Sequence, residues 1–202
     1  CLLSRGLGDV YKRQVVAAER PFDGRDDRVL FRGACGPGAK ARLELLSLRG
    51  LDGALDAGFT AVDGYESLQK CVDDLAARHG VVPAASASLR VAPLPMANYS
   101  NYKYLLHMPG AATGSYSRNL QYLFSHGAGG LVWRHAASEW YYRHLVDGVH
   151  YVAVDAASLP ATLAALRRDA GKRAALVAGA RAFFDAHLAA PRLVDRWAAT
   201  LG

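Results

Sequence analysis

Apolar and polar residues follow two kinds of pattern along the chain. Short apolar runs, rich in β-branched and aromatic residues, are typical of buried strands, and stretches with apolar residues every three or four positions are typical of helices. We expect strands at 29–31, 102–106, 131–133 and 149–154, and helices at 39–48, 65–79, 118–125 and 139–145, followed by Ala-rich helices over 158–201. Strands that alternate with helices in this way predict an α/β fold with a doubly wound, Rossmann-like parallel sheet.

A glycine-rich turn at 109–117 follows the expected strand 102–106 and opens the next helix. In open α/β sheets, ligands lie beyond the carboxyl ends of the strands, where such turns and helix N-termini present main-chain N–H groups. Small residues here let a phosphate approach the main chain, and the hydroxyls of Ser115 and Ser117 can bind an oxyanion. The alternative is a tight connection in which one serine caps the helix.

Phosphate binding at this turn requires help from other groups. A helix terminus contributes ~0.3–2 kcal/mol to anion binding, whereas micromolar nucleotide affinity corresponds to about 8 kcal/mol. A guanidinium adds ~1.5–3 kcal/mol for each charge-assisted hydrogen bond, and Arg32 and Arg118 both lie at transitions from strand to helix. Neither GxGxxG nor GxxxxGK[ST] occurs, which argues against a dinucleotide fingerprint and a P-loop.

Composition is that of an ordinary globular protein. The 202 residues are 51% hydrophobic and 21% charged, and no apolar run reaches the ~18 residues of a membrane helix, so we expect no membrane span. The net charge is +6, but no run of Lys or Arg exceeds two residues. Dispersed charge of this kind argues against a nucleic-acid partner and leaves a basic binding module as a weak alternative.

The first fourteen residues, CLLSRGLGDVYKRQ, resemble a translated sequencing adaptor and are excluded from the fold. They carry Arg5, Lys12 and Arg13 against Asp9, so their exclusion lowers the net charge from +6 to +4. We treat 15–202 as one domain and expect the native N-terminal part of the protein to precede it.

Metal ligation has no signature in the sequence. Cys1, Cys35 and Cys71 show no CxxC or Cys/His spacing, which argues against a zinc site. Cys35 and Cys71 either form one disulfide in an oxidising lumen or are two buried thiols, and the sequence leaves both possibilities open. Four histidines also lack ligand spacing and are expected in loops or at the surface: His107, His126, His135 and His144.

Seven short motifs occur in order between residues 29 and 197. They are FRG (31–33), LLS (45–47), DAGFT (56–60), YKYL (102–105), GSYS (114–117) leading to LQYL (120–123), EWYY (139–142) and VHYV (149–152). Their order and spacing resemble the C-terminal half of family 90 glycosyltransferases. This family includes the cryptococcal capsule-associated protein, bacterial lipopolysaccharide-modifying enzymes and animal protein O-glucosyltransferases of the endoplasmic reticulum.

The resemblance implies a two-domain GT-B architecture in which this chain is the C-terminal, donor-binding half. It implies inverting transfer from a UDP-sugar, UDP-glucose or UDP-xylose, to a hydroxyl of a protein or glycan acceptor, with no metal required. It places a eukaryotic member in the lumen of the secretory pathway, in the endoplasmic reticulum or Golgi. The family's catalytic aspartate lies in the N-terminal domain, so we expect no catalytic residue here and little transfer by this chain alone.

The resemblance also implies a set of donor-binding residues. Those expected at the diphosphate are Arg32, Gly33, Gly114, Ser115, Tyr116, Ser117, Arg118 and Asn119. Glu139 is expected near the ribose or sugar, where a carboxylate accepts hydrogen bonds from two hydroxyls; its alternative role is to complement a helix dipole. The family's arginine aligns with Asn119, so either the helix start shifts to bring Arg118, ~100° away, to the phosphate, or Asn119 makes a neutral contact. The alternative function is another nucleotide-binding Rossmann-like domain.

Overall fold

A parallel β-sheet of five strands in the order β2-β1-β3-β4-β5 forms the centre of the computed structural model. The structure describes residues 21–48, 51, 53–84, 89–110, 120–136 and 139–201, so the segment 1–14 and all but the first two residues of the predicted phosphate turn lie outside the described residues. The strands are β1 (Asp26–Cys35), β2 (Leu55–Val62), β3 (Tyr102–His107), β4 (Gly129–Trp133) and β5 (Val152–Val154).

A short extended segment adds to the free edge of β2. Arg90 pairs with Phe59 in a parallel bridge, Phe59 N donates to Leu89 O at 2.8 Å, and Val91 N donates to Phe59 O at 3.0 Å. Counted as a strand, this segment gives the order 3-2-1-4-5-6 found in dinucleotide-binding Rossmann folds.

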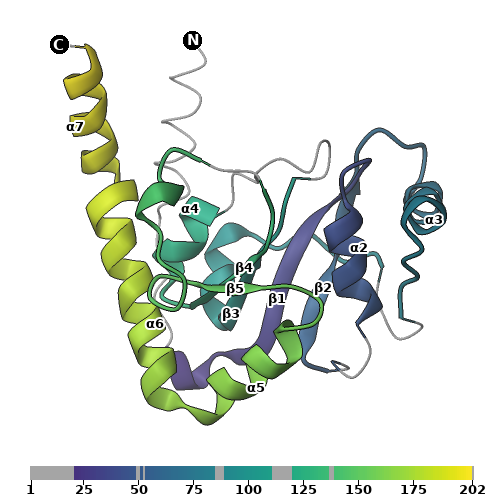
Figure 1. Ribbon diagram of the computed structural model, residues 1–202, viewed down its shortest axis with the longest axis horizontal. Coiled ribbons are helices and arrows are strands. Elements are labelled where there is room, and N and C mark those ends of the chain that lie inside the picture. Colours follow the sequence, from purple (N-terminus) through teal and green to yellow (C-terminus); the bar gives the residue numbers. More distant parts are fainter. Residues whose placement is uncertain are drawn as a thin grey trace.

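Helices cover both faces of the sheet (Figure 1). The α-helices are α2 (Lys40–Ser47), α3 (Leu68–His79), α4 (Leu120–Leu123), α5 (Leu159–Arg168), α6 (Ala170–Phe183) and α7 (Ala190–Leu201). The shorter turns are 3-10 helices η1 (Phe22–Gly24), η2 (Met96–Asn101), η3 (Phe124–His126) and η4 (Tyr142–His144), and the π-helical segment η5 (Phe184–Leu188). Leucines of α2, α3 and α5 pack on one face, and α4 and α6 contribute to the core on the other. The predicted doubly wound α/β fold is therefore confirmed.

Side-chain caps explain two of the helix boundaries. The hydroxyl of Ser67 accepts from Lys70 N at 3.2 Å at the start of α3, and Gly80 ends that helix at φ 66°. The carboxylate of Asp169 accepts from Lys172 N at 2.8 Å and separates α5 from α6. These are the residue types that satisfy the free main-chain groups at helix ends.

Two expectations about local structure are wrong. Strand β2 was not predicted, because its Asp, Ala, Gly and Thr residues weaken the strand pattern. The helix expected at 139–145 is instead a turn followed by η4. The main chain leaves the helical path because Val146 N donates to Nδ1 of His150 at 3.0 Å, and the Asp147 carboxylate accepts from Ala153 N at 2.9 Å. The His150 side chain thus takes the Val146 N–H, a main-chain group that a continuing helix would pair internally, and the Asp147 side chain ties the following loop to β5.

A disulfide joins the end of β1 to α3. Cys35 and Cys71 are both fully buried, and their Cα atoms are 6.3 Å apart. Of the two possibilities that the sequence leaves open, the structure therefore has the disulfide. Within the described ranges, no helix combines the length and the apolar character needed to cross a bilayer.

Close packing of α6 against the loop before β5 yields a testable expectation about stability. Alanine in place of a helical glycine is ordinarily stabilising by ~0.5–1 kcal/mol. At Gly179, however, a Cβ atom would lie 2.1 Å from the main-chain oxygen of Val149. We expect Gly179→Ala to lower the free energy of unfolding by ~1–3 kcal/mol, as overpacking does.

The matched control is Gly171→Ala in the same helix, where the nearest atom to the new Cβ would be 3.4 Å away. Urea unfolding of both variants checks this packing. A Gly179→Ala protein as stable as the Gly171→Ala protein would show that α6 does not approach the loop as described.

Candidate functional site

The candidate site is a cavity of about 160 Å³ at the carboxyl ends of β1 and β3. Its lining comes from five elements: Phe31, Arg32, Gly33 and Ala34 of β1, Arg42 of α2, Tyr99 of η2, Leu123 of α4, and Leu106, His107 and Met108 at the end of β3. The chain leaves β1 toward β2 on one side and enters β3 on the other, so the strand order reverses here. Open α/β sheets bind ligands at such a switch point.

Arg42 is a buried cation in the wall of this cavity. Its residue is 5% exposed, and its guanidinium donates from Nε and Nη2 to Pro109 O, at 2.9 and 2.6 Å, and from Nη1 to Ala34 O at 2.7 Å. Burial lowers its pKa to about 10, so it remains charged at neutral pH. Among the described residues, no carboxylate lies within ion-pair distance of it.

The hydrogen bonds of Arg42 leave capacity for a ligand. A guanidinium has five N–H donors, and three are used by the two carbonyl oxygens. An unpaired buried charge is costly unless a counter-ion is bound. The arrangement therefore suits an anion with several acceptor oxygens.

Gly33 makes room for the guanidinium. A Cβ atom at this position would lie 2.6 Å from Cζ of Phe31 and 2.9 Å from Nη1 of Arg42. The Phe31 ring supports the cation from another side, with its centroid 5.7 Å from Cζ of Arg42. The expected role of Gly33 at a diphosphate stays a prediction, and the structure adds a reason why glycine is needed there.

Arg32 also lines the cavity, but its charge is already paired. Its side chain is 11% exposed, and Nη2 donates to Oδ1 of Asp56 at 2.5 Å while Nη1 donates to the main-chain oxygen of Asp56 at 2.7 Å. The Tyr102 hydroxyl donates to the same carboxylate. A contact between Arg32 and a diphosphate stays a prediction.

The Asp56 carboxylate gives the fold a dependence on pH. Burial alone would raise its pKa, but hydrogen bonds from Tyr102 and Arg32 outweigh burial and hold it below the ordinary value. Burial and the bond to Asp56 raise the pKa of Tyr102 to about 12. Because the Asp56 pKa is lower in the folded chain, its contribution to stability is present above the unfolded pKa of ~4 and is lost as pH falls through the folded value.

Asp56→Asn is therefore expected to destabilise the chain by ~1–3 kcal/mol at pH 7 and by less at a pH below the folded pKa of Asp56, where the native carboxyl is also neutral. Denaturant unfolding at both pH values measures the difference. The control is Asp73→Asn on the exposed face of α3, which should have little effect at either pH. An equal loss for Asp56→Asn at both pH values would contradict the pairing.

A histidine cluster lies beside the cavity. His107 ends β3 and is 1% exposed, its ring is 5.9 Å from that of His135, and its Nε2 atom is 3.5 Å from the Tyr142 hydroxyl. Burial, together with the charges of His135 and Arg42, lowers the pKa of His107 to about 3, so this ring is neutral at physiological pH.

The expectation of loop or surface positions is wrong for His107 and His126, which are both buried. His107 is buried because it belongs to β3, and His126 because η3 packs beneath Tyr99, with ring centroids 6.0 Å apart. In the described segments, no three His, Cys, Asp or Glu side chains converge as a metal site would require.

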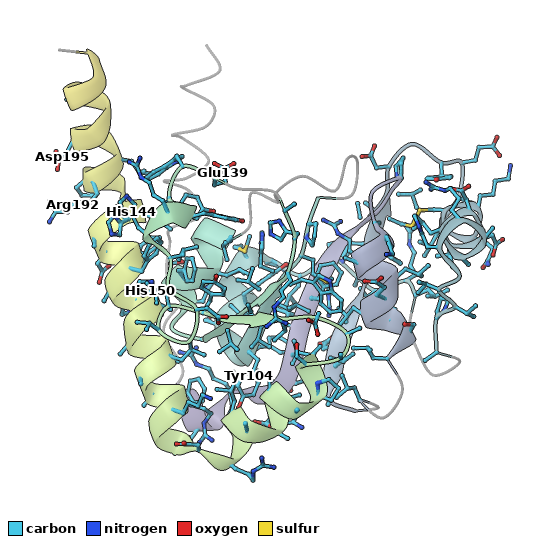
Figure 2. The ribbon with its side chains drawn as sticks, viewed as in Figure 1. Tyr104, Glu139, His144, His150, Arg192 and Asp195 are labelled. Atoms are coloured by element: carbon cyan, nitrogen blue, oxygen red, sulfur yellow. A yellow bond between two sulfur atoms is a disulfide. The ribbon has the colours of Figure 1, made fainter. Side chains whose placement is uncertain are left out.

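The remaining predicted residues are not assembled at the cavity. Glu139 is half-buried and lies at the edge of the molecule toward which β1 points, the upper edge in Figure 2, but it is not among the residues that line the cavity. The turn from Gly114 to Asn119 lies outside the described residues. Pro109, whose carbonyl binds Arg42, precedes that turn by a few residues.

Arg42 is the residue that sequence reasoning missed. A signal was present, because Arg42 shares a helical stripe with Ala39, Leu43 and Leu46, at the spacing of a buried face. All three neighbours are buried. An arginine on such a stripe indicates a buried charge that needs a partner.

Comparison with known proteins identifies the architecture. No family model matches the sequence, and no curated protein is significantly similar to it. The fold is similar to that of Anabaena Alr3699/HepE, solved with UDP and glucose, at a TM-score of 0.62 and 12% identity, over 96% of this chain and 51% of that one.

Two further structures agree. The C-terminal domain of the group 1 glycosyltransferase LpcC from Francisella tularensis gives a TM-score of 0.57 at 10% identity, covering 86% of this chain and 95% of that domain. The pneumococcal O-GlcNAc transferase GtfA, solved with UDP and GlcNAc, gives 0.55 at 12% identity, covering 92% of this chain and 36% of that one. The chain thus has the fold of a Rossmann-like half of a GT-B glycosyltransferase, and it spans about half of HepE and about a third of GtfA.

Proposed function

We propose that this chain is the donor-binding half of a family 90 glycosyltransferase and that its β1/β3 cavity receives a phosphoryl group of a UDP-sugar. The observation that carries the proposal is Arg42, a buried cation at the switch point of the sheet that uses three of its five donors on described residues. The seven ordered motifs support the family. The similar structures solved with UDP, UDP-glucose or UDP and GlcNAc support the donor class.

The size of the cavity limits what it can hold. Pockets for whole drug-sized ligands occupy roughly 300–1,000 Å³, whereas this cavity is about 160 Å³. It therefore suits one phosphoryl group, and the rest of the donor extends outward. The turn from Gly114 to Asn119 is the proposed neighbour of the second phosphate, and Arg42 holds the carbonyl of Pro109 just before that turn.

The proposed reaction transfers a sugar with inversion. The acceptor hydroxyl oxygen attacks the anomeric carbon, the bond from that carbon to the β-phosphate oxygen breaks, and UDP leaves with the bonding electrons. Arg42 stabilises the charge that develops on the leaving diphosphate, which is the role of a preorganised cation in such a step. A base supplied from outside this chain takes the proton of the acceptor hydroxyl.

The compartment and the acceptor belong to the same proposal. A buried disulfide persists in oxidising environments such as the secretory lumen or the bacterial periplasm. This favours an enzyme of the secretory pathway or the cell envelope, where protein and glycan hydroxyls are available as acceptors. No metal is required by the proposed mechanism, because the guanidinium supplies the positive charge.

Titration calorimetry tests the proposed function. The chain should bind UDP and UDP-glucose, bind ADP and GDP more weakly, and bind uridine at least tenfold more weakly than UDP, since uridine lacks the diphosphate. A preference for ADP or GDP would indicate another nucleotide-binding Rossmann-like domain. Binding to DNA or heparin that falls steeply with salt, without binding of nucleotides, would contradict the proposal and indicate a basic binding module.

A further inference from the structure

The end of β3 brings a second polar group to the cavity beside Arg42. His107 lines the cavity, and it is 1% exposed. Its two ring nitrogens have different surroundings, because Nε2 lies 3.5 Å from the Tyr142 hydroxyl whereas Nδ1 is buried and has no hydrogen-bond partner among the described residues. A buried polar atom without a partner is rare in folded proteins and calls for a ligand or another explanation.

We infer that His107 is a phosphate-binding residue, whose Nδ1–H group donates to an oxygen of the phosphoryl group that Arg42 binds. The inference rests on the proposed function and assigns a residue outside the set that the resemblance implies. In this inference the Tyr142 hydroxyl, 3.5 Å from Nε2, is the positioning group: a hydrogen bond donated to Nε2 would leave the proton of the neutral ring on Nδ1.

The surroundings of His107 favour a neutral donor over a second cation. Arg42, on α2, faces the same cavity, and His135, after β4, lies within ring contact, so protonation of His107 would place positive charges together in a buried space. A neutral imidazole offers one N–H group without that repulsion. Arg42 supplies the positive charge, and His107 supplies one directional hydrogen bond.

Substitution of His107 by residues with amide side chains distinguishes the contributions of its two ring nitrogens to UDP binding. Asparagine places its amide close to the position of Nδ1, whereas glutamine places it close to that of Nε2. Calorimetry with UDP and with uridine therefore compares His107→Asn, His107→Gln and His107→Leu with the unmodified chain, and thermal unfolding verifies that each variant is folded.

The inference predicts that His107→Asn binds UDP within about threefold of the unmodified chain. His107→Gln and His107→Leu should bind UDP about 10- to 100-fold more weakly, the loss expected for a hydrogen bond to a charged group. The ratio of UDP to uridine affinity should fall in the same two variants, because uridine carries no phosphate.

Unchanged UDP affinity in His107→Leu, or equal losses in the asparagine and glutamine variants, would overturn the inference and leave the proposed function intact. Failure of the unmodified chain to bind UDP would overturn both. If a variant does not fold, the ¹⁵N chemical shifts of His107 in the unmodified chain decide: a UDP-induced change at Nδ1, with Nδ1 protonated, supports the inference, and an unprotonated or unaffected Nδ1 refutes it.

Discussion

Arg42→Met is expected to weaken UDP binding by about 10- to 100-fold, because it removes charge-assisted hydrogen bonds worth ~1.5–3 kcal/mol each. Methionine keeps an unbranched side chain on α2 but leaves the oxygens of Pro109 and Ala34 without their donor. Arg42→Lys should recover part of the affinity, since a lysine retains the charge without the planar fork of donors. Titration calorimetry with UDP measures all three proteins.

The control for this series is Arg168→Met, an exposed arginine at the end of α5, the helix at the lower edge of Figure 1, and outside the cavity lining. Arg168→Met also removes one positive charge, and it should change UDP affinity by less than about twofold, as expected for a solvent-exposed group. Equal affinities of the Arg42→Met and Arg168→Met proteins would show that Arg42 is a structural residue alone. Denaturant unfolding accompanies the titrations, so that a loss of fold is not read as a loss of binding.

Removal of the disulfide is expected to destabilise the chain by ~2–4 kcal/mol. Cys35 and Cys71 are 36 positions apart, so the bond closes a long loop and restricts the unfolded chain strongly. The expected loss is a large fraction of the ~5–15 kcal/mol that stabilises a typical domain. Guanidinium unfolding of the Cys35→Ala/Cys71→Ala variant, compared with the oxidised chain, measures it.

The oxidised chain treated with a reducing agent is the internal control, because it loses the bond without losing the sulfur atoms. The reduced chain and the alanine variant should both unfold at a lower denaturant concentration than the oxidised chain. The alanine variant should unfold at the lowest concentration, since it also leaves two small cavities. A reduced chain as stable as the oxidised one would contradict the expected contribution of the bond.

The sequence predicts the sheet well where strands are apolar. The runs at 29–31, 102–106 and 131–133 lie within β1, β3 and β4, and the stretch at 39–48 contains α2. The three strands are covered on both faces of the sheet, so their apolar composition matches their buried position. The expected architecture followed from these elements.

The sequence fails where contacts between distant residues decide the local structure. Strand β2 forms because β1 and the Leu89–Val91 segment pair with it from both sides, in spite of its weak strand pattern. Such tertiary pairing overrides local propensity. The segment 139–145 differs for a local reason, because the His150 side chain binds the main-chain N–H of Val146 just after it.

The sequence indicates a site at the carboxyl edge of the sheet, and two of the residues it names, Arg32 and Gly33, line the cavity there. That these residues bind the donor stays a prediction. The sequence analysis selects Arg32 because it lies at a transition from strand to helix, yet its charge is paired with Asp56. It does not select Arg42, although this arginine shares a helical stripe with buried apolar residues. Which of two arginines has a carboxylate partner depends on side-chain contacts across the fold, and the sequence alone does not contain them.

The central claim is that a phosphoryl group of the donor binds at the β1/β3 switch point against Arg42. A crystal structure of the chain with UDP measures this directly. We expect a phosphoryl oxygen within about 3 Å of a guanidinium nitrogen of Arg42, which is hydrogen-bond distance. UDP bound elsewhere, with its phosphates away from Arg42 and the cavity filled by side chains alone, would contradict it.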